Sequence, residues 1–123
     1  MSRKTIKIAV KLFDINLKGA FFLCQSVLKV FSEQRSGNIV NVASLAAQRG
    51  GGLVGGSHYA ASKGGMLSLT RSIAREFGAL GVRANAICPA MIDTPMLDGL
   101  SEERLQAIVE GIPLRRIGST REM

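Results

Sequence analysis

Apolar residues recur at two different spacings along the chain, and the two spacings predict two kinds of element. Between Asp14 and about Phe31 they return every three or four residues, which is typical of a helix with one buried face. These residues are Leu17, Phe21, Cys24, Leu28 and Phe31. Residues 38–44, by contrast, are apolar nearly throughout and rich in β-branched side chains. This pattern predicts a short parallel strand that is covered on both faces.

The following residues repeat this alternation of helix and strand. A helix is expected from about His58 to Phe77, with a buried side formed by Ala60, Leu67, Ile73, Ala74 and Phe77. Residues 82–88 predict a second buried strand, which Pro89 ends. Ser101 precedes two glutamates and is expected to cap a further helix that runs to about Gly111.

Helices that alternate with short buried strands are typical of an α/β fold with a parallel sheet. We expect a Rossmann-like, doubly wound sheet, of which about two strands and three helices, the C-terminal half, are visible. The 123 residues form one domain or part of one. The first residues are ambiguous, because Ile6, Ile8, Val10 and Leu12 alternate as in a strand, whereas Ile8, Leu12 and Ile15 would extend the following helix. We favour a helix near Leu12 and make no prediction for the residues before it.

Composition and charge narrow the functional classes. The net charge of +7 can indicate a nucleic-acid partner. However, four basic residues fall within the first eleven positions, and one tyrosine with no tryptophan offers no platform for stacking bases. The two cysteines stand in apolar stretches and suggest neither a disulfide nor a metal site, and no apolar run approaches the roughly 20 residues of a membrane span. We expect a cytoplasmic protein with no nucleic-acid, membrane or metal partner.

Tyr59 and Lys63 are four positions apart at the start of a predicted helix. They therefore share one helical face, with Cβ atoms about 5–6 Å apart. A neighbouring ammonium favours the phenolate and brings a tyrosine pKa, ordinarily near 10, closer to the range of proton transfer at neutral pH. Ser44 ends the first predicted strand, where open parallel sheets place their sites. The alternative is a half-buried tyrosine and a solvated lysine without chemistry.

Five segments, in one order, resemble the short-chain dehydrogenase/reductases, which include ketoacyl reductases and sugar or steroid alcohol dehydrogenases. They are residues 16–19, 37–44, 59–63, 82–89 and 112–118. The resemblance extends from about Leu12 to Met123, and the basic segment 1–11 does not match. The family usually has a glycine where this chain has Ala90. The family's glycine-rich phosphate-binding turn and its last strand are not found, so the chain resembles a piece cut from both ends.

The resemblance implies a catalytic role for four residues. Tyr59 would act as the general acid or base, and Ser44 would donate a hydrogen bond to the same substrate oxygen. Lys63 would hold the nicotinamide ribose hydroxyls and lower the pKa of the tyrosine. Asn16 would hold a water molecule that links Lys63 to solvent, whereas its position alone suggests only a helix surface residue.

The resemblance also implies a cofactor, a reaction and a partner. Pro89, Ile92 and Thr94 would help to bind NAD or NADP, with Thr94 and the backbone of Ile92 at the nicotinamide carboxamide. The expected reaction interconverts a small-molecule secondary alcohol and a ketone by hydride transfer. The alternative is a non-catalytic fragment or interaction module, because the phosphate-binding half is missing. In the family, helices matching 14–31 and 58–77 pack against a second subunit, so a homo-oligomer is expected.

Gly50, Gly52 and Gly55 also satisfy G-x-G-x-x-G, the dinucleotide fingerprint. That fingerprint requires glycines that directly follow a strand and open a helix, whereas about five residues intervene between Ser44 and Gly50. Glu76, about twenty residues on, falls in the last turn of a predicted helix and not at a strand end. We therefore expect a flexible loop beside the substrate. His58 is interpreted as a residue of this loop and not as a base.

Overall fold

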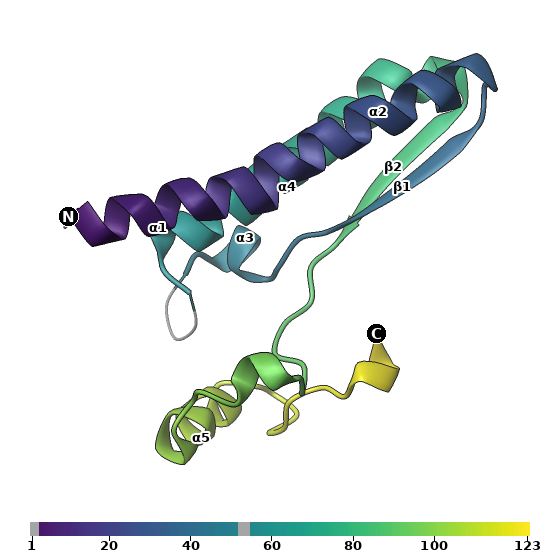
Figure 1. Cartoon of the computed structure of the whole chain (residues 1–123). Helices are drawn as coiled ribbons and strands as arrows, with labels where there is room; N and C mark the ends of the chain where they lie inside the picture. Colours follow the sequence, from purple (N-terminus) through teal and green to yellow (C-terminus); the bar gives the residue numbers. More distant parts are fainter. Residues whose placement is uncertain (1–2, 52–54) are drawn as a thin grey trace. The chain divides into compact units, whose positions relative to one another are not determined.

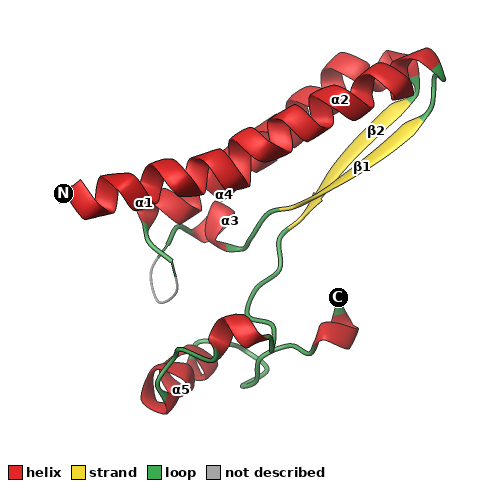
Figure 2. Cartoon of the chain, in the orientation of Figure 1, coloured by secondary structure: helices red, strands yellow, loops and turns green. Residues whose placement is uncertain are grey.

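The computed structural model describes residues 3–51 and 55–123, which divide after Cys88 into two compact units. The first unit contains, in chain order, α1 (Arg3–Phe13), α2 (Ala20–Glu33), β1 (Gly37–Val42), α3 (Ala46–Arg49), α4 (Ser57–Phe77) and β2 (Val82–Ile87) (Figures 1 and 2). The second unit contains α5 (Glu102–Glu110) and short 3-10 turns at Pro95–Leu97 and Thr120–Glu122. Apart from α1 and α3, these helices and strands lie where the hydrophobic pattern predicts them.

The first helical region is long and not uniform. It runs without a break from α1 into α2 through a π-helical turn, η1 (Asp14–Gly19). The helix favoured near Leu12 is thus present. Residues 3–11, for which the sequence decided nothing, are helical as well, and Ile6, Ile8 and Val10 are about half exposed on α1.

The two strands form a parallel pair, in which Gly37 lies opposite Val82 and Val42 opposite Ile87. Helix α4 makes the crossover between them, as a parallel connection requires. A glycine is needed just before β2: Gly81 has φ +79°, and its Cα lies against the carbonyl of Arg35, so a side chain there has no room. The parallel strands and their helical crossover confirm the predicted α/β class.

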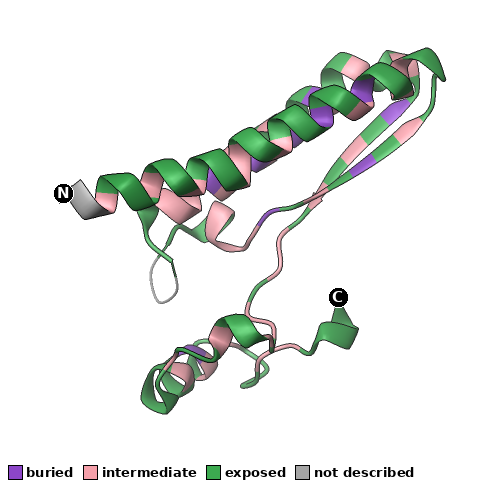
Figure 3. Cartoon of the chain, viewed as in Figure 1, coloured by how far each residue is buried: buried purple, intermediate pink, exposed green. Residues whose placement is uncertain are grey.

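A small core joins α2, α4 and one face of the strand pair (Figure 3). Its buried members are Cys24, Leu28, Ile39, Ile73 and Val82. The predicted buried sides were only partly right, since Phe21 is 47% exposed and α4 buries Ser62, Met66 and Thr70 in place of Ala60 and Leu67. The error has a physical cause: polar side chains that are buried with hydrogen-bond partners carry no hydrophobic signal.

The other face of the strand pair differs from the prediction. Val40, Val42 and Ile87 are each 40–53% exposed, so the strands are not covered on both faces. Among residues 3–51 and 55–123, no helix is long and apolar enough to cross a membrane.

Candidate active site

Ser44 lies just beyond the carboxyl end of β1, as predicted. Pairing of the strands continues one residue past β1, because the Ala43 N–H donates to the carbonyl of Ile87 at 2.8 Å. The chain then turns into α3, and the Ser44 hydroxyl oxygen accepts a hydrogen bond from the Ala46 N–H at 3.2 Å. The serine is half-buried, and this bond fixes its hydroxyl at the strand end.

Tyr59 and Lys63 lie in the first two turns of α4, one turn apart, as their spacing predicts. The Tyr59 N–H donates to the carbonyl of Gly56 at 3.1 Å, which closes the first turn. Gly55 has φ +77°, and a Cβ there would lie 2.8 Å from the tyrosine ring. The backbone at Gly55 therefore packs directly beside the ring, which only a glycine permits.

Lys63 connects α4 to the end of β1. Its Nζ donates a hydrogen bond to the carbonyl of Val42 at 2.9 Å. Val42 is the last residue of β1 and precedes Ser44 by two positions. The structure thus brings Lys63 to the strand end that carries Ser44, and α3 packs against α4 in the same region.

Asn16 lies in the π-helical turn η1 and also contacts α4. Its Nδ2 donates to the Ser62 hydroxyl oxygen at 3.2 Å, and that hydroxyl donates to the carbonyl of Tyr59 at 2.8 Å. The structure therefore links Asn16 to the turn of α4 that carries Tyr59. Sequence reasoning missed Ser62, because a serine between Tyr59 and Lys63 has no pattern that marks it as buried.

A second set of polar side chains fastens β1 to α4 behind the site. Asn41 Nδ2 donates to the Thr70 hydroxyl at 2.9 Å, and that hydroxyl donates to the carbonyl of Met66 at 2.8 Å. The Cys24 thiol lies 4.0 Å from Asn41 Oδ1. Burial raises the pKa of this thiol, against the opposing effect of its hydrogen bond to Asn41, so Cys24 stays protonated and serves packing.

The glycine loop lies between α3 and α4. Gly50 follows helix α3 and not a strand, which agrees with setting aside the dinucleotide fingerprint. Gly52 lies outside the described residues. His58 is half-buried in the first turn of α4 and not in the loop, where the sequence had placed it.

In the second unit, the residues expected at the nicotinamide lie on a short bridge. Ile92 pairs in parallel with Gly118. The Gly118 N–H donates a hydrogen bond to the carbonyl of Met91 at 2.9 Å, and the Asp93 N–H donates one to the carbonyl of Gly118 at 2.8 Å. In such a pair the N–H and C=O of Ile92 itself point away from Gly118. The Thr94 hydroxyl lies 3.5 Å from the carbonyl of Ile92. Both backbone groups of Ile92 thus face the side opposite Gly118.

Ala90 needs no glycine conformation. Within the described residues, the non-glycine residues with positive φ are Arg35 and Arg115. The methyl group of Ala90 therefore does not strain the loop that follows Pro89. The departure from the family pattern at this position therefore requires no unusual backbone conformation.

An ion pair stabilises the bridge of the second unit. The Arg116 guanidinium binds both carboxylate oxygens of Glu122, at 2.9 and 2.7 Å, and the Ser119 N–H donates to the same carboxylate at 2.7 Å. The hydrogen bond from Arg116, followed by those from Ser119, lowers the pKa of Glu122 from its ordinary 4.5 to about 2. Gly118, which pairs with Ile92, lies between Arg116 and Ser119 in the sequence.

Comparison with known proteins shows extensive similarity to reductases and dehydrogenases. A family model described as enoyl-(acyl carrier protein) reductase matches residues 3–123. The 3-oxoacyl-[acyl-carrier-protein] reductase of Thermotoga maritima is 38% identical over 110 residues, which are 89% of this chain and 44% of that protein. The 2-(R)-hydroxypropyl-CoM dehydrogenase of Xanthobacter autotrophicus is 37% identical over 115 residues, which are 92% of this chain and 45% of that protein.

A solved structure gives the same result for the fold. The 3-oxoacyl-[acyl-carrier protein] reductase of Brucella melitensis superposes with a TM-score of 0.87 and 31% sequence identity, over 97% of this chain and 43% of that protein. The predicted Rossmann-like class is thereby confirmed. The chain spans less than half the length of these relatives.

Proposed function

The chain belongs to the short-chain dehydrogenase/reductase family, and from that premise we propose that it serves the NAD(P)-dependent interconversion of a secondary alcohol and a ketone. One observation carries the proposal. The hydrogen bond from Lys63 to Val42 brings the amine of the Tyr59 helix to the strand end that carries Ser44. We infer that the Tyr59 phenol reaches the same strand end, where a phenol, an amine and a hydroxyl together would form a proton-transfer site for a carbonyl oxygen.

Each of the two units, taken by itself, offers groups that suit a part of the nicotinamide half of such a cofactor. Lys63 brings an ammonium, a donor of three hydrogen bonds, to the strand end where ribose hydroxyls would be held. Ile92 offers a backbone N–H that its bridge leaves unused and a C=O that accepts a hydrogen bond from the Thr94 hydroxyl at 3.5 Å, and both groups suit a carboxamide. Thr94 adds a hydroxyl two residues after Ile92. Pro89 lies two residues after the end of β2. We assign the nicotinamide carboxamide to Ile92 and Thr94.

The proposed reaction uses four side chains of this chain in different ways. When bound, the cofactor supplies or accepts a hydride. Tyr59 donates a proton to the oxygen of the reduced carbonyl, or removes it from the alcohol in the reverse direction. Ser44 donates a hydrogen bond to the same oxygen and stabilises the negative charge that develops there. Asn16 and Lys63 connect the phenol to solvent so that its proton is replaced.

We propose a 3-oxoacyl thioester as the substrate class to be tested first. The relatives from Thermotoga maritima and Brucella melitensis are named for reduction of 3-oxoacyl groups on a carrier protein. The chain spans less than half of each relative, so the assay needs the missing part of the protein. It uses the Thermotoga maritima enzyme with its matching 110-residue segment replaced by this chain, a protein that we call the reductase chimera.

The test replaces Tyr59 with phenylalanine in the reductase chimera. This change removes the proton donor but keeps the ring that packs on Gly55, so the turnover number should fall by about 100-fold or more. His58→Gln, at the neighbouring position, serves as the matched control and should keep turnover within about twofold of the parent. Oxidation of NADPH and of NADH is followed by absorbance with a 3-oxoacyl thioester. Turnover in Tyr59→Phe equal to that of the control would remove the assignment.

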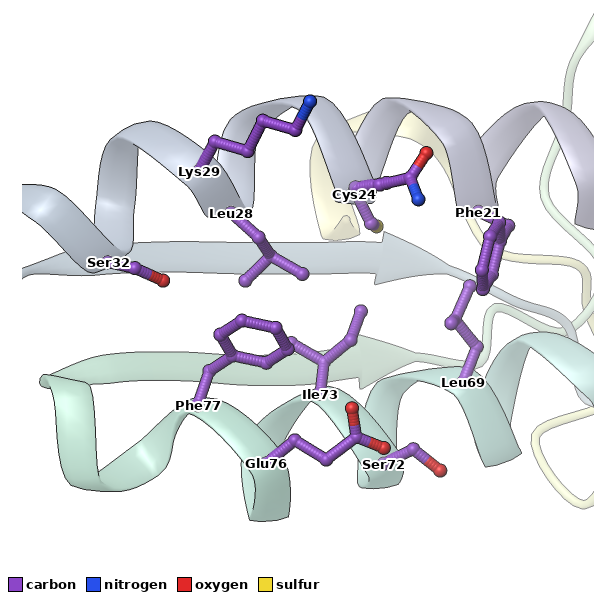
Figure 4. A pocket seen from close by; sticks show the side chains of 11 residues that line it. Phe21, Cys24, Leu28, Lys29, Ser32, Leu69, Ser72, Ile73, Glu76 and Phe77 are labelled. Atoms are coloured by element: carbon purple, nitrogen blue, oxygen red, sulfur yellow. The ribbon is translucent and has the colours of Figure 1, made fainter.

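We further propose that the chain associates with a second copy through α2 and α4. A groove of about 640 Å³ runs between these helices, with apolar side chains along its floor (Figure 4). Its lining includes Phe21, Leu28, Leu69, Ile73 and Phe77, with Lys29 on the α2 side and Glu76 on the α4 side. A two-fold axis that lays α2 of one copy against α4 of the second would bring Lys29 to Glu76 twice, because in such an interface each contact occurs in both directions.

The oligomer prediction is tested with Phe21→Glu, which places a charge on the apolar lining of the groove. We expect the variant to be monomeric in sedimentation equilibrium at concentrations where the parent is dimeric or larger. Val30→Glu makes the same change on the opposite side of α2, where the side chain is 55% exposed, against 47% for Phe21. The control should associate as the parent does. A parent that is monomeric, or equal dissociation in both variants, would contradict this interface.

A further inference from the structure

Ser62 stands apart from the other polar residues near the site because its side chain is fully buried. Its relative exposure is 0%, and it occupies the position directly before Lys63 on α4. A buried hydroxyl costs free energy unless both its donor and its acceptor capacity are used. Ser62 meets this requirement with two partners on different elements.

The two hydrogen bonds of Ser62 have a fixed direction. Its hydroxyl has one proton, and that proton is donated to the carbonyl of Tyr59 at 2.8 Å. Toward Asn16, at 3.2 Å, Ser62 can therefore only accept. The nitrogen of the Asn16 amide must then face Ser62, and the amide oxygen must face away from it. The direction of the Ser62 hydroxyl proton thus decides the orientation of the Asn16 amide, with its nitrogen toward Ser62 and its oxygen away from Ser62.

The backbone around this contact leaves little freedom. Asn16 lies in the π-helical turn η1, and such widened turns are frequent at functional sites. The next residue, Leu17, packs on Gly65, where an added Cβ would come within 2.7 Å of the leucine side chain. Ser62 and Gly65 are three positions apart on one face of α4. Two neighbouring contacts therefore lock η1 to α4, one by a hydrogen bond and one by close packing.

We propose that Ser62 is a positioning residue, which orients the amide of Asn16 so that its oxygen is presented as an acceptor and holds the turn of α4 that carries Tyr59. This inference rests on the proposed function, in which Asn16 and Lys63 connect the phenol to solvent. Removal of the Ser62 hydroxyl leaves the amide of Asn16 free to rotate. The expected defect is in proton supply and not in binding.

The test is a double-mutant cycle in the reductase chimera with Ser62→Ala, Asn16→Ala and the pair. We expect Ser62→Ala to lower kcat by roughly tenfold, with the KM values for cofactor and thioester within about twofold of the parent and an altered pH profile of kcat. Since Ser62 acts through Asn16, the pair should lose no more than Asn16→Ala alone. Ser68→Ala, on the exposed side of the same helix, is the matched control and should change neither kcat nor the pH profile.

Three results would overturn the inference: a Ser62→Ala enzyme with the kcat and pH profile of the control, a loss confined to KM, or losses that multiply in the pair. Should Ser62→Ala fail to fold, Ser62→Cys keeps a weak acceptor in a similar volume. It should then show a smaller kcat loss and the same lack of additivity with Asn16→Ala. A multiplicative loss in that variant counts equally against the inference.

A second readout separates this inference from the proposed function. In the 123-residue chain, the side-chain amide resonances of Asn16 should shift and exchange faster with solvent in Ser62→Ala, and not in Ser68→Ala. Unshifted resonances refute the positioning role. If Tyr59→Phe retained full turnover while these resonances shifted, the proposed function would fail and the orientation of Asn16 by Ser62 would stand.

Discussion

The two units of the chain are stabilised by different means. In the first unit, a cluster of buried apolar side chains joins α2, α4 and the strands, and buried hydrogen bonds fasten β1 to α4. In the second unit, all of whose residues the structure describes, Ile108 is the one buried apolar side chain. This unit is stabilised mainly by local polar contacts. The Ser101 hydroxyl caps α5, as predicted, by accepting a hydrogen bond from the Arg104 N–H, and the Arg116 guanidinium binds the Glu122 carboxylate.

This difference corresponds to two ways of holding proposed functional groups. Ser44, Tyr59 and Lys63 project from elements whose positions depend on apolar packing, which is insensitive to salt and pH. Ile92 lies on a bridge that one ion pair and a few hydrogen bonds maintain, and such contacts respond to both. We therefore expect the proposed catalytic groups to be rigid, and the proposed carboxamide site to depend on salt and pH.

The largest effect on stability is expected from Ile73→Ala. Ile73 is 3% exposed in the core of the first unit, and the cavity left by its truncation should cost about 3 kcal/mol in the free energy of unfolding. Urea titrations followed by far-UV circular dichroism measure this loss. A cost below about 1 kcal/mol would contradict the view that packing holds the first unit.

The same truncation in the second unit provides the matched comparison. Ile108 is similarly buried, at 6%, but it has no other buried apolar neighbour in its unit, so its surroundings can collapse around the smaller side chain. Ile108→Ala should cost about 1 kcal/mol, and amide exchange should rise in α5 and not in α4. Equal costs for the two truncations would show that the two units are stabilised in the same way.

The smallest effect is expected from pH and is confined to the second unit. Because the folded pKa of Glu122 lies below its ordinary 4.5, its ion pair contributes fully above pH 4.5, and the contribution is lost as the pH falls toward 2. The carboxyl ¹³C resonance of Glu122 should titrate near 2 in the parent and at a clearly higher pH in Arg116→Gln, where the hydrogen bonds from Ser119 still hold the pKa below its ordinary 4.5. A titration near 4.5 in both chains would contradict the ion pair.

Sequence reasoning succeeded where one signal decided the outcome. Apolar spacing located α2, α4 and both strands, and the strand ends placed Ser44 correctly. The residue motifs also predicted membership of the short-chain dehydrogenase/reductase family, which the comparisons confirm. Spacing of four placed Tyr59 and Lys63 one turn apart.

Sequence reasoning failed where contacts between distant residues determine the local backbone or the burial of a side chain. The π-helical turn at Asp14–Gly19 has no sequence pattern of its own, and the spacing of Ile8 and Val10 left strand and helix open, whereas both residues lie on α1. Ser62 and Thr70 were missed because a buried hydroxyl is recognisable only once its partners, Asn16 and Asn41, are known. Polar burial is a property of pairs that lie far apart in the sequence.

Transfer of a labelled hydrogen tests the central claim most directly. The reductase chimera is given NADPH or NADH deuterated at both C4 positions of the nicotinamide, with a 3-oxoacyl thioester, and the product is analysed by mass spectrometry. We predict one deuterium on the carbinol carbon with the parent, and formation of this product at least about 100-fold slower with Tyr59→Phe. A folded parent chimera that transfers no deuterium, or a Tyr59→Phe enzyme that transfers it at the parent rate, would contradict the account.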